Sequence, residues 1–230
     1  MALTLGSLFS GCGGLDLGLE RAGMRVVWQC EIDDYATRVL ERHWPDAKRY
    51  RDVRDIDATA ARVDVICGGF PCVNISNAGK KEGIDGEHSG LWREYARIVG
   101  LLRPRFVVVE NVAALVARGL DRVLGDLAAL GYDASWSCVS ACAVGATHSR
   151  ERLFLVAYSD GDSESARAID EEVARLPAYA GALRDGWAAE PRTLRMAHGF
   201  PHGMDRLRLM GNAVVPALAE LVGRVVVEAA

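Results

Sequence analysis

The sequence predicts an α/β fold in which helices cover both faces of a doubly wound, mostly parallel sheet. From residue 1 to about residue 158, short β-rich apolar runs alternate with segments of helical periodicity. Half of the 230 residues are apolar, which is enough to bury one substantial core with a small appendage. We therefore expect one main domain rather than two.

Each expected strand is a short apolar run, and the strands follow one another in the order Leu3–Phe9, Arg25–Cys30, Val63–Cys67, Arg105–Val109, Ala134–Val139 and Leu153–Ala157. Between them, apolar side chains recur three and four residues apart, as they do on one face of an amphipathic helix. The expected helices are Leu15–Ala22, Tyr35–His43, Leu91–Leu102 and Leu115–Leu130, with a closing apolar helix over Ala213–Val227.

Residues 160–190 break this alternation, because they carry eight acidic and only three basic side chains. Arginines resume between Arg192 and Arg208, and the closing helix follows Gly211-Asn212. These changes divide the chain into a main domain at 1–158, a small region at 159–209 and a C-terminal helix at 210–230 that completes the main domain.

Charge and composition limit the functional classes. The formal net charge is −4, so a nucleic-acid site must be a local basic face. The first residues lack the basic region of a signal peptide, and no apolar run approaches the length of a membrane span, so we expect a soluble cytoplasmic protein. The six cysteines lack the paired spacing of a zinc site, and we expect reduced thiols and no metal.

A glycine-rich loop, Phe9-Ser10-Gly11-Cys12-Gly13-Gly14, lies between the first strand and the first helix. Glycines there let the backbone approach a nucleotide-type cofactor, although they also serve as tight connections. Glu31 ends the next strand 20 residues after Gly11, where an acid can accept both hydroxyls of a ribose. Asp52 could accept from an adenine amino group. Either carboxylate could instead be an ordinary helix cap or a solvated residue.

The run Gly68-Gly69-Phe70-Pro71-Cys72 directly follows an expected strand. Cys72 should therefore emerge at the carboxyl edge of the sheet, where ligands of open α/β folds bind. A buried, inert cysteine is the commoner alternative. The polar, glycine-rich stretch over residues 74–90 resembles a mobile lid, and its segment Gly79–Gly83 carries charges that could meet phosphate.

The strand Arg105–Val109 leads into Glu110-Asn111-Val112, which puts a carboxylate on the same edge of the sheet as Cys72. A general acid could be held there, and a helix N-terminal acid is the alternative. Arg150 and Arg152 alternate ahead of the last strand, so they project to one face and could converge on a base or a phosphate. Surface arginines are the alternative.

In this order, the segments resemble the cytosine-C5 DNA methyltransferase family, particularly its compact bacterial and phage-type members. The resemblance covers residues 4–158 and 190–228. The matching segments are the cofactor loop Phe9–Gly14, the ribose acid Glu31, the adenine pair Asp52-Val53, the nucleophile motif Gly68–Cys72, the Glu-Asn-Val motif at Glu110, the arginine motif His148–Arg152 and the final cofactor motif Gly211–Pro216. The region between Ala157 and Gly211 is shorter than the family's usual target-recognition region.

The resemblance implies a Rossmann-like fold that uses S-adenosylmethionine to methylate C5 of a flipped-out cytosine in double-stranded DNA, in DNA methylation or restriction–modification. It implies the catalytic residues Cys72, Glu110, Arg150 and Arg152. It implies the cofactor contacts Phe9, Gly11, Gly13, Gly14, Glu31, Ile32, Asp52, Val53, Phe70, Pro71, Leu91, Asn212 and Val214. For DNA we expect Ser76, Lys80, Lys81, Arg192, Arg195, Arg206 and Arg208 to make contacts, and we expect a monomer without an obligate protein partner.

Three alternatives stay open at this point. The chain could be a catalytically weak or silent relative that binds S-adenosylmethionine or DNA, or it could methylate cytosine in RNA. A dehydrogenase-like dinucleotide enzyme would share the glycine-rich loop and the acid after the second strand. It would leave Cys72, Glu110 and the C-terminal motif unexplained.

Overall fold

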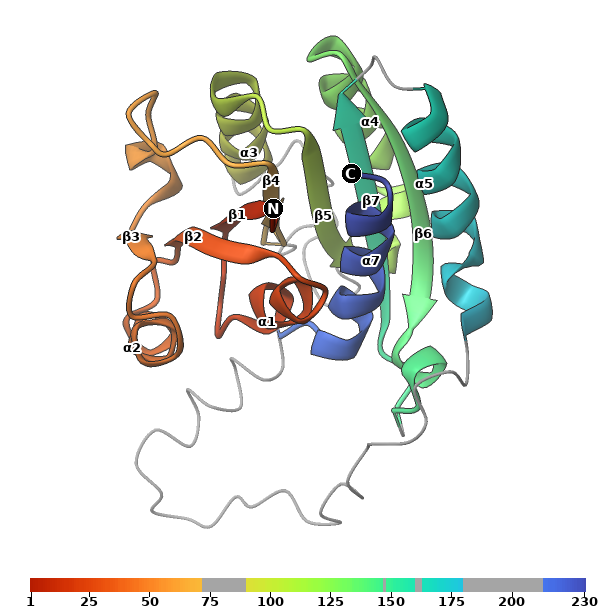
Figure 1. The fold of residues 1–230 in the computed structure, drawn as a ribbon, viewed down its shortest axis with the longest axis horizontal. Helices are drawn as coiled ribbons and strands as arrows, with labels where there is room; N and C mark the ends of the chain where they lie inside the picture. Colours follow the sequence, from red (N-terminus) through yellow and green to blue (C-terminus); the bar gives the residue numbers. More distant parts are fainter. Residues whose placement is uncertain (72–89, 147, 160–162, 180–212) are drawn as a thin grey trace.

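A seven-stranded sheet organises the part of the chain that the computed structural model describes, which is residues 1–71, 90–146, 148–159, 163–179 and 213–230 (Figure 1). The strands are β1 (Thr4–Leu8), β2 (Arg25–Cys30), β3 (Lys48–Tyr50), β4 (Val65–Gly68), β5 (Phe106–Val112), β6 (Tyr132–Ser140) and β7 (Glu151–Ser159). Their order across the sheet is β3-β2-β1-β4-β5-β7-β6. All neighbours pair in parallel except β7, which is antiparallel to both β5 and β6.

The strand order reverses between β1 and β4. The chain runs outward from β1 through β2 to β3, then returns to place β4 on the other side of β1. In open α/β sheets, the crevice at the carboxyl ends of the strands at such a reversal is where ligands bind. The doubly wound, mostly parallel fold class predicted from the sequence is confirmed.

Helices cover both faces of the sheet (Figure 1). They are α1 (Gly14–Arg21), α2 (Asp34–His43), α3 (Gly90–Leu102), α4 (Leu120–Ala129), α5 (Ser163–Arg175) and α7 (Pro216–Glu228). One core cluster joins the sheet to α1, α5 and α7, and another joins it to α3 and α4. Val108 of β5 belongs to the first cluster, whereas Val107 and Val109 belong to the second, because successive side chains of a strand point to opposite faces.

Helices α1 and α7 are far apart in sequence but pack closely through small residues. A Cβ added at Gly18 would lie 2.4 Å from the Ala219 Cβ and 2.4 Å from the Pro216 carbonyl oxygen. One added at Gly14 would lie 2.6 Å from the Val214 carbonyl oxygen. This close approach brings the segment before α7 against the glycine-rich loop.

Three sequence predictions need correction. The helix expected over Leu115–Leu130 is divided into a 3-10 turn, Ala113–Ala117, and α4, because Gly119 between them has a φ of 144°. The three-residue strand β3 was not predicted, since Lys48, Arg49 and Tyr50 carry no apolar run.

The acidic segment over residues 160–190 was expected to break the alternation of strands and helices, but it contains α5. The helix buries Ile169 and Val173 four residues apart, and Leu176 follows in the next turn. All three belong to the core cluster shared with α1 and α7, so residues 163–179 pack on the main core.

None of the helices in the described residues is long and apolar enough to span a bilayer.

Candidate functional site

A cavity of about 650 Å³ lies at the carboxyl ends of β1, β2, β4 and β5. Eleven of the thirteen residues predicted to contact the cofactor line it, namely Phe9, Gly11, Gly14, Glu31, Ile32, Asp52, Val53, Phe70, Pro71, Leu91 and Val214. Glu110 and Arg152 line the same cavity. Segments from eight parts of the sequence therefore converge here, at the edge where ligands of open α/β sheets bind.

Of the other two predicted cofactor contacts, only Gly13 lies within the described residues, and it is not among those that line the cavity. Gly13 has a φ of 83°, and a Cβ there would lie 2.4 Å from the Trp44 ring, so this glycine accommodates a turn and a close packing contact. Asn212 lies outside the described residues. Their contact with a cofactor stays a prediction.

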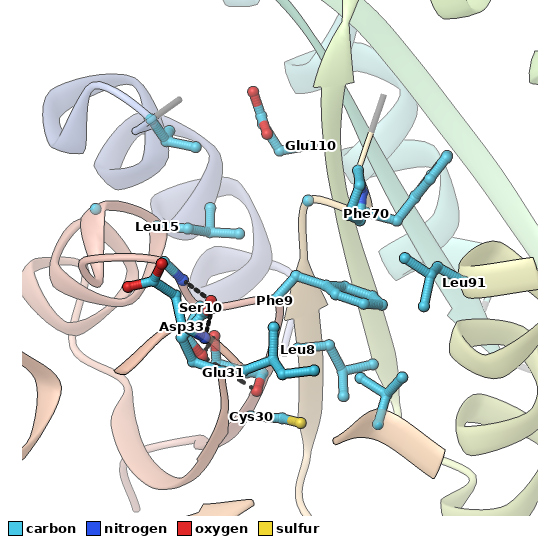
Figure 2. Close-up of a pocket in the computed structure, with 18 of the residues that line it drawn as sticks. Leu8, Phe9, Ser10, Leu15, Cys30, Glu31, Asp33, Phe70, Leu91 and Glu110 are labelled. Carbon is cyan, nitrogen blue, oxygen red and sulfur yellow. Dashed lines mark hydrogen bonds between the residues drawn. The ribbon is translucent and has the colours of Figure 1, made fainter. Parts of the chain in front are cut away.

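The glycine-rich loop is fixed to the end of β2 (Figure 2). The Gly11 amide donates to Oε2 of Glu31 at 2.7 Å, and the Asp33 amide donates to Oε1 at 2.8 Å. Phe9 and Gly11 have φ values of 54° and 56°, in the left-handed region, which makes the loop turn sharply after β1. Each Glu31 carboxylate oxygen accepts one backbone hydrogen bond and has lone-pair capacity left for a ligand.

A buried carboxylate, which sequence reasoning missed, lies beneath this loop. Asp16 accepts from the Ser7 hydroxyl at 3.0 Å and from the Gln29 amide at 2.6 Å. The Ser10 hydroxyl lies 2.9 Å from that of Ser7. Burial raises the pKa of Asp16 to about 6, against the lowering effect of the hydrogen bonds from Gln29 and Ser7. The available signal was a charged residue beside Leu15, on the buried face of the first helix.

Asp52 and Arg51 lie at the part of the cavity formed by β2 and β3. Asp52 caps a 3-10 turn by accepting from the Arg54 amide at 2.9 Å, and it forms an ion pair with the Arg54 guanidinium. The side-chain hydrogen bond from Arg54 lowers the pKa of Asp52. Arg51 donates to the Ile32 carbonyl and to Asp34, so it joins the walls formed by residues 31–33 and 51–54. Sequence reasoning did not single out Arg51.

Glu110 lies near the carboxyl end of β5, well separated from Ser10, Glu31 and Asp33 in Figure 2. Its side chain is 9% exposed, and Oε1 lies 2.9 Å from Nε of Arg152 on β7. The two residues meet because the antiparallel register pairs Glu110 with Phe154, two positions from Arg152 on the same face. Burial raises the pKa of Glu110 to about 7, outweighing the opposing charges of Arg152 and Arg150.

Asn111, the residue after Glu110, holds the turn that follows β4 through a hydrogen bond. The Asn111 side-chain amide donates to the Phe70 carbonyl at 3.0 Å, and its Oδ1 accepts from the Val112 amide at 2.9 Å. Asn111 is 3% exposed, and the Phe70 ring packs against Trp92 with ring centroids 5.3 Å apart. The Glu-Asn-Val motif includes Asn111, but the sequence alone predicted no role for its side chain.

Several predicted site residues lie outside the described residues. These are Cys72, Ser76, Lys80, Lys81, Arg192, Arg195, Arg206, Arg208 and Asn212, together with nearly all of the expected lid over 74–90. Their roles stay predictions. Cys72 is the residue that follows Pro71, which lines the cavity. Within the described ranges, no three His, Cys, Asp or Glu side chains group closely enough to hold a metal ion.

Comparison with known proteins points to one family. The family described as C-5 cytosine-specific DNA methylase matches residues 3–194. The Type II methyltransferase M.Eco47II of Escherichia coli is 37% identical over 74% of this chain, and M.NgoFVII of Neisseria gonorrhoeae is 32% identical over 65%. The chain spans 42% of the length of either relative.

The solved structure of the Entamoeba histolytica methyltransferase EhMeth superimposes with a TM-score of 0.61, over 71% of this chain and 55% of its own. Its sequence identity is 17%, so it supports the fold alone. The family match covers both the glycine-rich loop and Glu110. The chain belongs to the C-5 cytosine-specific DNA methylase family.

Proposed function

We propose that this chain transfers a methyl group from S-adenosylmethionine to carbon 5 of a flipped-out cytosine in double-stranded DNA. The observation that carries the proposal is the buried Glu110 carboxyl group, which lines the cavity beside the turn that leads to Cys72. Its pKa of about 7 keeps a substantial fraction of the group protonated at neutral pH, as a general acid requires. Membership of the methylase family supports the reaction class and does not fit the dehydrogenase alternative.

The cavity has suitable partners for S-adenosylmethionine. Glu31 would accept from the ribose hydroxyls, since both of its oxygens are oriented by backbone amides. Ile32 is 67% exposed and lines the cavity, so a flat adenine ring would cover an apolar side chain that is otherwise in water. Asp52 would accept from the adenine amino group. When bound, the cofactor supplies an electrophilic methyl group.

A cysteine is needed because carbon 5 of cytosine is a poor nucleophile. Addition of the Cys72 thiolate to carbon 6 makes carbon 5 enamine-like, so that it can take the methyl group. Glu110 would donate a proton to N3 as negative charge builds up on the ring. A base such as water then removes the proton at carbon 5, and the bond between carbon 6 and sulfur breaks to release the Cys72 thiolate. N3 returns its proton to Glu110, which restores the neutral aromatic ring. A free cysteine thiol has a pKa of about 8.5, so only a few per cent of it is thiolate at pH 7.

Arg152 on β7 and Arg150 just before β7 would orient Glu110 and the target base. Arg152 bonds to Glu110 through Nε, and its Nη1 donates to the Glu151 carbonyl at 2.8 Å. Its other N–H groups would donate to O2 of the base or to a phosphate. The charge of Arg150 also acts on Glu110.

A stacked cytosine exposes neither ring face to a thiol, so the base must leave the duplex at a cost of about a few kcal/mol.

We further propose how DNA is engaged. Of the predicted recognition region at 159–209, residues 163–179 pack on the main core, so residues 180–209 would carry recognition and the rest of the chain would form the catalytic domain. Phosphates repel the acidic residues 160–190, so Arg192, Arg195, Arg206 and Arg208 would face DNA together with Ser76, Lys80 and Lys81. The Type II relatives support a cytoplasmic role in restriction–modification.

Trapping the covalent intermediate tests the reaction. Duplex DNA with 5-fluorocytosine in random sequence contexts, incubated with the chain and S-adenosylmethionine, should form an adduct at Cys72, because no proton can leave carbon 5. Cys72→Ser should form none. A methyl-transfer assay that compares duplex DNA with total RNA tests the RNA alternative. Bisulfite sequencing of DNA from cells that express the chain gives the sequence context. No adduct on any DNA context would refute the proposal and favour a silent or RNA-directed relative.

A further inference from the structure

Gly69 directly faces the Glu110 carboxyl group. A Cβ added at Gly69 would lie 2.5 Å from Oε2 of Glu110 and 3.3 Å from the Glu110 carbonyl oxygen. Both residues line the cavity. We infer that Gly69 is a positioning residue for Glu110, because the carboxyl group occupies the space that any side chain at residue 69 would fill. This inference rests on the proposed function of Glu110 as the acid that acts on the base.

The strand register explains why these two residues meet. In the parallel pairing of β4 and β5, Gly68 at the end of β4 lies opposite Val109, so Gly69, the residue after β4, lies beside Glu110. The other carboxyl oxygen, Oε1, lies 2.9 Å from Nε of Arg152. The carboxyl group is therefore held between the guanidinium on β7 and the bare backbone after β4.

A side chain at residue 69 would displace the acid without unfolding the protein. The atom in closest conflict is the far end of the Glu110 side chain, which can rotate away, although it then loses its contact with Arg152. The Glu110 carbonyl oxygen at 3.3 Å needs to shift by only a few tenths of an ångström. Gly69 has no positive φ, so alanine fits its backbone conformation. Gly69→Ala should thus keep the fold but turn the Glu110 carboxyl group out of its position.

The preceding glycine provides a contrasting case. A Cβ at Gly68 would lie 2.5 Å from the Leu8 carbonyl oxygen and 3.1 Å from the Leu8 Cβ. These atoms belong to β1, which cannot move without breaking its pairing with β4. Gly68→Ala should therefore lower the unfolding temperature, whereas Gly69→Ala should mainly affect catalysis. The sequence alone does not separate these two glycines.

The experiment compares Gly69→Ala with the wild type and with Gly125→Ala, an alanine substitution in α4 where nothing lies within 4 Å of the added Cβ. Turnover on duplex DNA should fall at least 30-fold in Gly69→Ala, while the Kd for S-adenosylmethionine stays within threefold. Gly125→Ala should retain wild-type turnover. In a Glu110→Gln background, Gly69→Ala should change the residual turnover by less than twofold, because the effect acts through Glu110.

A second readout does not depend on activity. Carbon-13 carboxyl NMR of glutamate-labelled protein should show Glu110 titrating near neutral pH in the wild type and clearly lower in Gly69→Ala, because the displaced group gains solvent. An unchanged titration with turnover within threefold of wild type overturns the inference. If the wild type shows no turnover, the proposed function fails while the titration still decides the positioning role.

If Gly69→Ala does not fold, the double variant Gly69→Ala/Glu110→Ala shows whether contact with the Glu110 carboxyl group is the cause. It removes the carboxyl group that the added methyl would meet. Recovery of folding in the double variant supports contact with Glu110 as the cause. Failure of the double variant to fold overturns the inference, because the added methyl must then conflict with something else.

Discussion

The Gly11 amide donates to Oε2 of Glu31 at 2.7 Å, and this bond joins the loop after β1 to the end of β2. The Asp33 amide holds the other oxygen, so the protein itself orients the carboxylate. Glu31 thus has two functions that share the same atoms. It shapes the glycine-rich loop, and it presents the remaining lone pairs to the cavity.

Glu31→Gln should weaken the binding of S-adenosylmethionine. The substitution replaces one carboxylate oxygen by an NH2 group that opposes a backbone amide donor, and hydrogen bonds to charged groups contribute about 1.5–3 kcal/mol. We expect the Kd, measured by titration calorimetry, to rise about 10-fold or more. Asp57→Asn, in an exposed turn that bonds Thr59, is the control and should leave the Kd within twofold. Equal Kd values for wild type and Glu31→Gln would contradict this role.

The raised pKa of Glu110 makes stability depend on pH. Between its ordinary value of 4.5 and about 7, the folded protein retains a proton that the unfolded chain has released. Stability therefore falls as pH rises through this window, by at most about 3 kcal/mol. Glu110→Gln cannot titrate, so the difference between its free energy of unfolding and that of the wild type should change across the window. Urea unfolding from pH 4.5 to 8 measures it, and a constant difference would contradict the assignment.

Asn111→Asp should slow catalysis by freeing the turn that leads to Cys72. The variant retains the shape and the Oδ1 acceptor but loses the donor to the Phe70 carbonyl. We expect a stability loss of about 1–3 kcal/mol and adduct formation with 5-fluorocytosine DNA about 10-fold slower. Tyr132→Phe is the matched control, because it removes a buried hydroxyl that donates to the Pro104 carbonyl at the opposite edge of the sheet. Equal adduct rates in both variants would count against a role for Asn111 in the site.

Gly18→Ala should loosen α7 from α1. The added methyl conflicts with Ala219 and with the Pro216 carbonyl oxygen, and overpacking of this kind costs about 1–3 kcal/mol. Since Val214 before α7 lines the cavity, the Kd for S-adenosylmethionine should rise as well. Gly125→Ala should instead raise stability by up to about 1 kcal/mol, because alanine favours a helix and no atom opposes it. Thermal unfolding measures both effects. If the two substitutions changed the unfolding temperature in the same direction, the packing explanation would be contradicted.

Much of the fold could be predicted because its signals are local. Central strands such as Val107–Val109 are buried on both faces and appear as continuous apolar runs. The helices showed their apolar faces three and four residues apart. The strand β3 gave no such signal, since only three residues pair at the edge of the sheet. The helix α5 was missed because its charged face dominates the composition, although Ile169 and Val173 are buried on its other face.

The candidate site could be predicted as a set of residues, but its geometry could not. Motif resemblance named Glu31 and Glu110 and placed both on the edge of a sheet. It did not reveal that the Gly11 amide orients Glu31, or that Asp16 is buried beneath the loop. Those facts depend on contacts between segments that are 13 to 20 residues apart in the sequence.

By itself, the sequence determined the fold class, the family and the identity of half of the residues that line the cavity, because apolar periodicity and motif order are properties of a linear chain. Only the tertiary structure decided which of those residues touch. The antiparallel register of β5 and β7 brings Arg152 into an ion pair with Glu110. The missing side chain at Gly69 leaves room for the Glu110 carboxyl group. The physical reason is that burial, strand register and close packing depend on neighbours brought together from distant positions, and these set the orientation and the pKa of an acid.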